Sequence, residues 1–243
     1  MLHSIDLNLT RAAIGCALLA LPGMAVADVL VVRAIGPSAA AYKPGRKLAD
    51  TASIPLKAGD QITLLDNKGT RTLKGPGSFT AAASGSTAAP TTLAGLASTA
   101  GNRRARTGAV RDVRAMAEAA RPSIWMVDAG QSGTVCVPKA DEVAVWRKDA
   151  DAAGATTITG PGGQSGSIDW IKGQSMQPWP AGLPVTPGAS YTLKGAGAAA
   201  AGTAVKFALV DSPPGDLSAL GGTLIAAGCQ AQLDMLIATA DGG

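Results

Sequence analysis

The stretch that decides the N-terminal fold spans residues 53–79 and reads SIPLKAGDQITLLDNKGTRTLKGPGSF. It holds three short runs rich in β-branched and aliphatic side chains, at 53–57, 61–65 and 70–74, and each is bounded by Gly, Pro, Asp or Asn. Asp66, Asn67, Lys68 and Gly69 separate the last two runs, and Gly69 can adopt a positive φ. We therefore expect a tight hairpin here, within a small all-β unit that also takes a strand from residues 29–32.

The same stretch resembles the FecR-like β domain of bacterial envelope proteins. The shared features are Lys-Ala-Gly-Asp at 57–60 ahead of a strand, the turn at 66–69, and the strand 70–73 running into Gly-Pro-Gly at 75–77. The resemblance covers about residues 28–80 and implies a periplasmic β module. In the best-known members this domain belongs to a membrane-spanning regulator of a sigma factor. We find no sigma-binding segment or membrane helix ahead of the domain, and so do not expect sigma-factor control.

Residues 1–27 are predicted to be a secretory signal peptide. Arg11 supplies positive charge, residues 12–21 form a ten-residue apolar run, and Ala-Val-Ala at 25–27 suits a signal peptidase, so the mature chain should begin at Asp28. A transmembrane helix needs roughly 20 apolar residues, so we expect a periplasmic protein with no membrane span. Cys16 leaves a lipoprotein signal as the alternative.

The composition excludes several classes of chemistry. The one histidine, His3, lies in the predicted signal peptide, which removes Ser-His-Asp and Cys-His catalysis and His-ligated zinc. The Gly-rich stretch 160–166 lacks the Gly-Lys-Ser/Thr ending of a phosphate-binding loop. We predict no enzyme activity, no cofactor and no metal. Paired carboxylates are the remaining catalytic option, although we interpret the candidates as solvated surface acids: Asp128, Asp141, Glu142 and Asp169.

Two cysteines, Cys136 and Cys229, remain after removal of the signal peptide. In an oxidising compartment we expect a disulfide between them, with two buried free thiols as the alternative. Cys229 stands at the start of the last predicted helix, so the bridge would tie this helix to a sheet.

Residues 123–243 are predicted to form a second β-rich domain. Several candidate strands alternate polar and apolar residues, as half-buried antiparallel strands do. They lie at 124–128, 134–137, 142–147, 156–159, 167–171, 191–194 and 204–210. Asp216 is a candidate helix N-cap and Gly228 a candidate helix end, although Gly221 and Gly222 weaken the helix between them. We thus predict a mainly β protein of two small, sandwich-like domains, 28–80 and 123–243, the second ending in one or two helices.

Residues 81–122 are interpreted as a flexible basic linker. After an Ala/Ser/Thr/Gly-rich part, residues 102–121 hold six arginines and two acids. Arg103, Arg104 and Arg106 are candidate contacts to an anionic partner, and a solubilising role is the alternative. Residues 122–243 hold six basic and ten acidic side chains, so we expect the linker to contact acidic surfaces at low salt. Without aromatic side chains near these arginines, nucleic acid is not expected as a partner.

The four tryptophans fall in the second domain. Three of them lie in predicted strands and are assigned to the core, because a domain this poor in Phe needs other large side chains inside. Trp179, between two prolines in a loop-like run, is the candidate exposed binding residue.

These features together predict an exported, non-catalytic envelope protein. It would serve as a ligand- or protein-binding or sensor-accessory module, with an unknown envelope protein or glycan as partner. Two alternatives stay open. One is a carboxylate-dependent cell-wall or glycan hydrolase, with two acids converging near Trp179, and the other is a passive structural protein of the envelope.

Overall fold

The computed structural model describes residues 28–82, 121 and 123–241. The predicted signal peptide and most of the predicted linker, including Arg103, Arg104 and Arg106, lie outside the described residues. The described chain is mainly β and ends in two helices, which confirms the predicted fold class.

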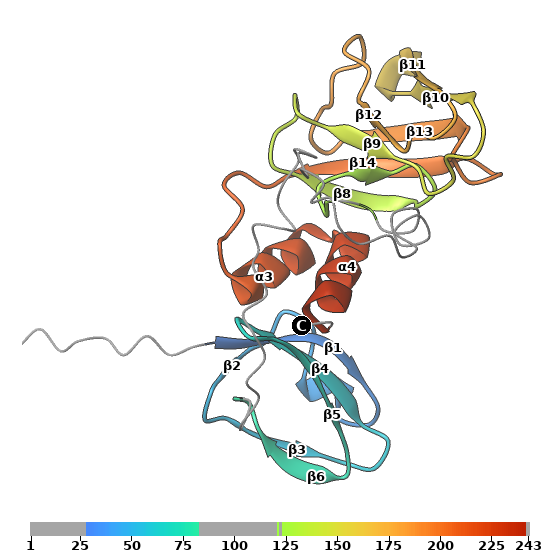
Figure 1. The fold of residues 1–243 in the computed structure, drawn as a ribbon. Coiled ribbons are helices and arrows are strands. Elements are labelled where there is room, and N and C mark those ends of the chain that lie inside the picture. Colours follow the sequence, from blue (N-terminus) through green and yellow to red (C-terminus); the bar gives the residue numbers. More distant parts are fainter. Residues whose placement is uncertain (1–27, 83–120, 122, 242–243) are drawn as a thin grey trace, which may run out of the picture.

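The first β unit packs a four-stranded sheet against a two-stranded one (Figure 1). The larger sheet has the antiparallel order β2-β1-β4-β5, and β3 pairs with β6 in the smaller sheet. The strands are β1 (Asp28–Ile35), β2 (Lys47–Ala49), β3 (Ser53–Leu56), β4 (Gln61–Asp66), β5 (Gly69–Lys74) and β6 (Gly77–Thr80), with a short 3-10 helix η1 (Ala39–Ala41) after β1. Val31, Ile54 and Leu64 belong to the core between the sheets.

The predicted hairpin between β4 and β5 is confirmed. Gly69 has a φ of +133°, and the Asp66 carboxylate accepts a hydrogen bond of 2.7 Å from the backbone N–H of Lys68. The hairpin sets Thr63 opposite Thr72 and Gln61 opposite Lys74.

The second unit is a sandwich of a five-stranded sheet, β11-β10-β13-β14-β8, and a three-stranded sheet, β12-β9-β7. Its strands are β7 (Val127–Asp128), β8 (Gly133–Val137), β9 (Ala144–Trp146), β10 (Gly154–Thr159), β11 (Ser165–Trp170), β12 (Met176–Pro178), β13 (Ser190–Gly195) and β14 (Thr203–Leu209), with a 3-10 turn η2 (Pro161–Gly163) between β10 and β11. Trp170, Tyr191 and Phe207 are the largest fully buried side chains in the core between the sheets.

Two helices follow, α3 (Leu217–Ala227) and α4 (Gln230–Asp241). The Asp216 carboxylate accepts a hydrogen bond of 2.7 Å from the N–H of Ala219, and Gly228 adopts a left-handed conformation with a φ of +74°. Both predicted helix ends are therefore confirmed.

The helices form a layer between the two β units (Figure 1). Leu30 and Leu65 of the first unit share one apolar core with Leu220 and Leu224 of α3 and with Val210 at the end of the second unit. Because this core draws side chains from three layers, the two β units are packed together through the helices.

The first unit also meets α3 through its hairpin and its sheet face. The Asn67 side chain accepts a hydrogen bond of 3.2 Å from the backbone N–H of Leu217, so the turn of the hairpin supplements the N-cap of α3. On the next turn of α3, a Cβ atom at Gly221 would stand 2.7 Å from Leu65 Cδ2 and 3.0 Å from Leu30 Cδ2. A larger residue at 221 would force these buried leucine side chains to shift.

The predicted Cys136–Cys229 disulfide is present, with a Cα–Cα distance of 5.8 Å, and joins β8 to the residue before α4. Beside it, the buried Gln232 side chain of α4 accepts a hydrogen bond of 2.6 Å from the Cys136 N–H. The same side chain donates 2.8 Å hydrogen bonds to the carbonyl oxygens of Ile124 and Cys136. The helical layer is thus attached to the second unit by a covalent bond and by a fully buried polar network.

Candidate functional site

The structure does not expose Trp179, so the prediction of an exposed binding role is wrong. Its side chain is 9% exposed, and its indole N–H donates a hydrogen bond of 2.6 Å to the Leu183 carbonyl oxygen. The ring meets Tyr191 and Phe207 edge to face, with centroid distances of 5.3 and 5.1 Å. Trp179 directly follows Pro178, the last residue of β12, and its ring points into the core.

The candidate carboxylates have local roles. Asp128 accepts a hydrogen bond of 2.9 Å from the N–H of Gly130 in a turn, and Glu142 forms an ion pair of 2.7 Å with Lys139. Asp141 and Asp169 are exposed.

Within residues 28–82, 121 and 123–241, no group of three or more His, Cys, Asp or Glu side chains is placed to hold a metal ion. No helix in the same ranges is long and apolar enough to cross a membrane.

Another set of residues does come together, on the face of the four-stranded sheet that also packs against the helices. We call it the open sheet face. It comprises Arg33, Ile35, Gln61, Thr72 and Lys74, together with Thr63, which is buried between Arg33 and Thr72. Pairing aligns Arg33 with Thr63 and Thr72 in one row across β1, β4 and β5, and aligns Ile35 with Gln61 and Lys74 in the next row.

Strand geometry explains why these side chains share a face. Thr63 and Gln61 stand two and four residues before Leu65, whose side chain belongs to the helix-facing core, and alternate residues of a strand point the same way. On β1, a shift of register between Val31 and Arg33 marks a bulge, which brings Arg33 onto the side of the helix-facing Val32. The apolar end of this face is covered by α3 and α4, and the polar end continues beyond them.

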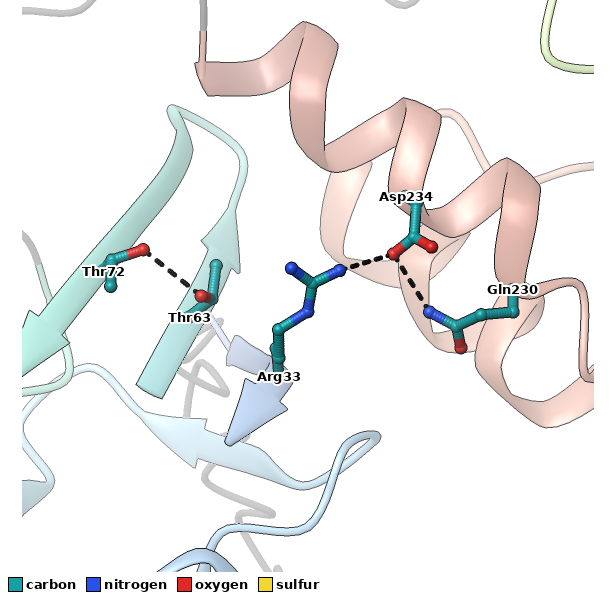
Figure 2. Close-up of polar contacts among 5 residues, drawn as sticks. All are labelled: Arg33, Thr63, Thr72, Gln230 and Asp234. Atoms are coloured by element: carbon teal, nitrogen blue, oxygen red, sulfur yellow. Dashed lines mark hydrogen bonds and ion pairs between the residues drawn. The ribbon is translucent and has the colours of Figure 1, made fainter. Parts of the chain in front are cut away.

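Helix α4 stands over the edge of the open sheet face, as Figure 2 shows. Arg33 reaches from β1 to Asp234 of α4 with an N–O distance of 2.7 Å, and the Gln230 amide donates a hydrogen bond of 3.0 Å to the same carboxylate oxygen. The Thr63 and Thr72 hydroxyls lie 3.2 Å apart beside them. Because Arg33 and Asp234 are 55% and 45% exposed, their pair contributes at most about 1 kcal/mol to stability. Its main effect is to fix where the guanidinium points.

The open sheet face is cationic with an apolar side chain at its edge. Arg33 and Lys74 carry the charge, both are exposed, and Ile35 is 54% exposed. The acidic side chain that meets this face is Asp234, which already pairs with Arg33. Such a surface suits non-covalent binding of an anionic group next to an apolar one.

Asp60 directly precedes Gln61 of the open sheet face, but its carboxylate is hydrogen-bonded within the fold. Asp60 is buried, and its carboxylate accepts hydrogen bonds of 2.7 and 2.6 Å from the backbone N–H groups of Ser38 and Lys57. Burial acts to raise the pKa of Asp60, but hydrogen bonding by the Ser38 side chain and by these two backbone N–H groups, together with the charge of Lys57, outweighs it and holds the pKa below its ordinary value. Asp60 therefore stays ionised and fastens the turn after β1 to the turn before β4.

The sequence reasoning missed the open sheet face. The sequence predicted strands at 29–32, 61–65 and 70–74 and a hairpin between the last two, but not which strand lies beside that hairpin. The one usable signal was the alternation of Thr70, Thr72 and Lys74, which marks the polar side of β5 without saying which strands lie beside it.

Comparison of the chain with protein-family models, with curated proteins and with solved structures gives no match. The class is therefore defined by the fold and the site themselves: a disulfide-linked protein of two β units held together by a helical layer, with a cationic sheet face beside that layer.

Proposed function

We propose that this protein is an exported, non-catalytic binding module of the bacterial envelope and that it binds a partner protein through the open sheet face. The observation that carries the proposal is that the helices cover only part of one sheet face. Its apolar half packs against α3 and α4, while its other half offers Arg33, Ile35 and Lys74 to the solvent.

Export is supported by three independent features. The apolar run at 12–21 with its small-residue end is typical of a signal peptide, and the stretch 53–79 resembles the FecR-like domain of envelope proteins. The Cys136–Cys229 disulfide is of a kind that persists in oxidising compartments such as the periplasm. We place the mature start at Asp28, the first residue of β1.

A binding role is favoured by the rigidity of the presented surface. Three paired strands carry the open sheet face, and the Arg33–Asp234 pair and the shared core fix α4 beside it. A surface that is already ordered loses little conformational entropy when a partner binds. The hydrolase alternative has less support, because the Trp179 ring on which it depends is buried.

The test is photo-crosslinking in cells that export the protein, with p-benzoylphenylalanine in place of Ile35. The matched control carries the same group in place of Ile171, which is 69% exposed and follows β11 in the second unit. We expect a discrete crosslinked protein from position 35 and none of the same mass from position 171. Equal products from both positions, or none from position 35, would contradict the proposal.

A further inference from the structure

We infer that the segment bound by the open sheet face is acidic and carries an apolar side chain close to its acidic groups. This inference rests on the proposed function and names the chemistry of the partner at the same site. It is carried by the charge of the face, by the spacing of its rows and by its continuity with the interface to the helices.

Charge selects an anionic partner. Lys74 is exposed, and its strand neighbour across the sheet is the uncharged Gln61, so its ammonium group has no acid opposite it. Arg33 shares its charge with Asp234 and keeps more than half of its side-chain surface exposed. Two cations on one small face attract an acidic segment and repel a basic one.

The row Ile35–Gln61–Lys74 sets a distance between apolar and charged contacts. Neighbouring strands lie about 4.8 Å apart, so Ile35 and Lys74, on the two outer strands of the row, are separated by about 10 Å. An extended chain spans this distance in about three residues. A partner with an apolar residue and an acid at that separation can therefore contact both ends of the row at once.

Continuity with the α3–α4 interface argues for a protein segment over a small anion. Side chains of the helices cover Leu30 and Leu65 at one end of this face, and Ile35 lies on the same face beyond the row Arg33–Thr63–Thr72, where it is exposed. Burial of an exposed Ile side chain favours binding, and a free phosphate would leave Ile35 uncovered. A peptide can pair with Lys74 and cover Ile35 together.

The probe is a short synthetic peptide of Gly and Glu with one central Leu, titrated into the purified isotope-labelled protein and followed by NMR. We expect shifts of the backbone amides of Ile35, Gln61 and Lys74 at low salt, largely lost near 1 M salt, where the screening length is about 3 Å. The same peptide with Gln in place of every Glu should bind much more weakly.

Three substitutions separate binding from structure. Lys74→Glu should weaken the peptide roughly tenfold, since it replaces an attraction by a repulsion of about 1 kcal/mol in total or slightly more. Asp234→Asn should tighten it a few-fold, because Arg33 is released toward the peptide. Lys194→Glu, at an exposed position of β13 in the second unit, is the matched control and should leave the affinity unchanged.

Several outcomes would overturn the inference. They are equal binding of the Gln peptide, amide shifts confined to another surface, weaker binding by Asp234→Asn, or equally strong shifts of the same amides by an oligothymidylate. Shifts of these amides on concentrating the protein alone would instead assign the face to a second copy. A crosslink from position 35 to a partner without an acidic segment would leave the proposed function intact and remove this inference. Absence of any crosslink there would contradict the function itself.

Discussion

At the scale of single residues, Asp60 shows how a short sequence feature acts on structure. Lys57-Ala58-Gly59-Asp60 places a carboxylate where it accepts backbone N–H groups from two different turns. Gly36 adopts a φ of +104° beside it, and a Cβ atom there would stand 2.6 Å from an Asp60 carboxylate oxygen. The feature thus serves the fold of the first β unit and not a binding site.

The depressed pKa of Asp60 makes stability depend on pH in a defined direction. Because the folded pKa lies below the unfolded value, the stabilisation is complete above the unfolded pKa and is lost as the pH falls through the folded pKa. We expect Asp60→Asn to lower the free energy of unfolding at pH 7 and to reduce the further loss on acidification below about pH 4. Urea unfolding at several pH values, followed by circular dichroism, measures both.

The control for this prediction is Asp211→Asn, at an exposed position after β14. It should retain the acid sensitivity of the unsubstituted protein. An Asp60→Asn protein that is as stable as the parent at pH 7 would contradict a stabilising role for the Asp60 carboxylate.

The residues that the sequence predicted correctly are those whose roles are local or covalent. Asp216 and Gly228 end a helix through groups within a few residues, and of the two cysteines left after the predicted signal peptide each has one possible partner. Trp179 was misjudged because flanking prolines describe the backbone and not the direction of the ring. Arg33, Thr63 and Thr72 could not be grouped, since their proximity depends on the pairing of three strands and on a bulge.

At the scale of elements, the sequence of α3 reflects its position between the two β units. Its sequence, LSALGGTLIAA, holds no charged side chain, as expected for a helix with neighbours on more than one side. Its two adjacent glycines, Gly221 and Gly222, weakened the prediction of this helix. The structure assigns them different roles, since a Cβ at Gly221 would press on Leu65 and Leu30 while a Cβ at Gly222 meets nothing within 4 Å.

Alanine substitutions at these two positions should therefore differ. Gly222→Ala should stabilise the protein by about 0.5–1 kcal/mol, the gain from reduced backbone freedom. Gly221→Ala should be less stable than Gly222→Ala by about 1–3 kcal/mol, because the added methyl group overpacks the buried contact with β1 and β4. Chemical unfolding of the three proteins under one condition measures the difference. Equal stabilisation by both alanines would mean that α3 does not approach the sheet closely.

At the scale of the whole molecule, the helical layer shows what holds the two β units together. The sequence predicted two β domains joined by a basic linker that contacts acidic surfaces at low salt. In the structure, the two units share an apolar core through Leu30, Leu65, Leu220, Leu224 and Val210. The ends of the last helices could be predicted from Asp216 and Gly228, but these local signals do not say which sheets the helices pack against.

The claim on which the binding proposal depends is that α3 and α4 hold the two β units as one body, with α4 fixed beside the open sheet face. The direct measurement is the distance between spin labels on cysteines introduced at Ala49 of β2 and Thr157 of β10, both exposed, by pulsed electron resonance. We expect one narrow distance distribution that is the same at low salt and near 1 M salt, because burial of apolar surface is not screened. A broad distribution, or one that widens as salt is added, would contradict it.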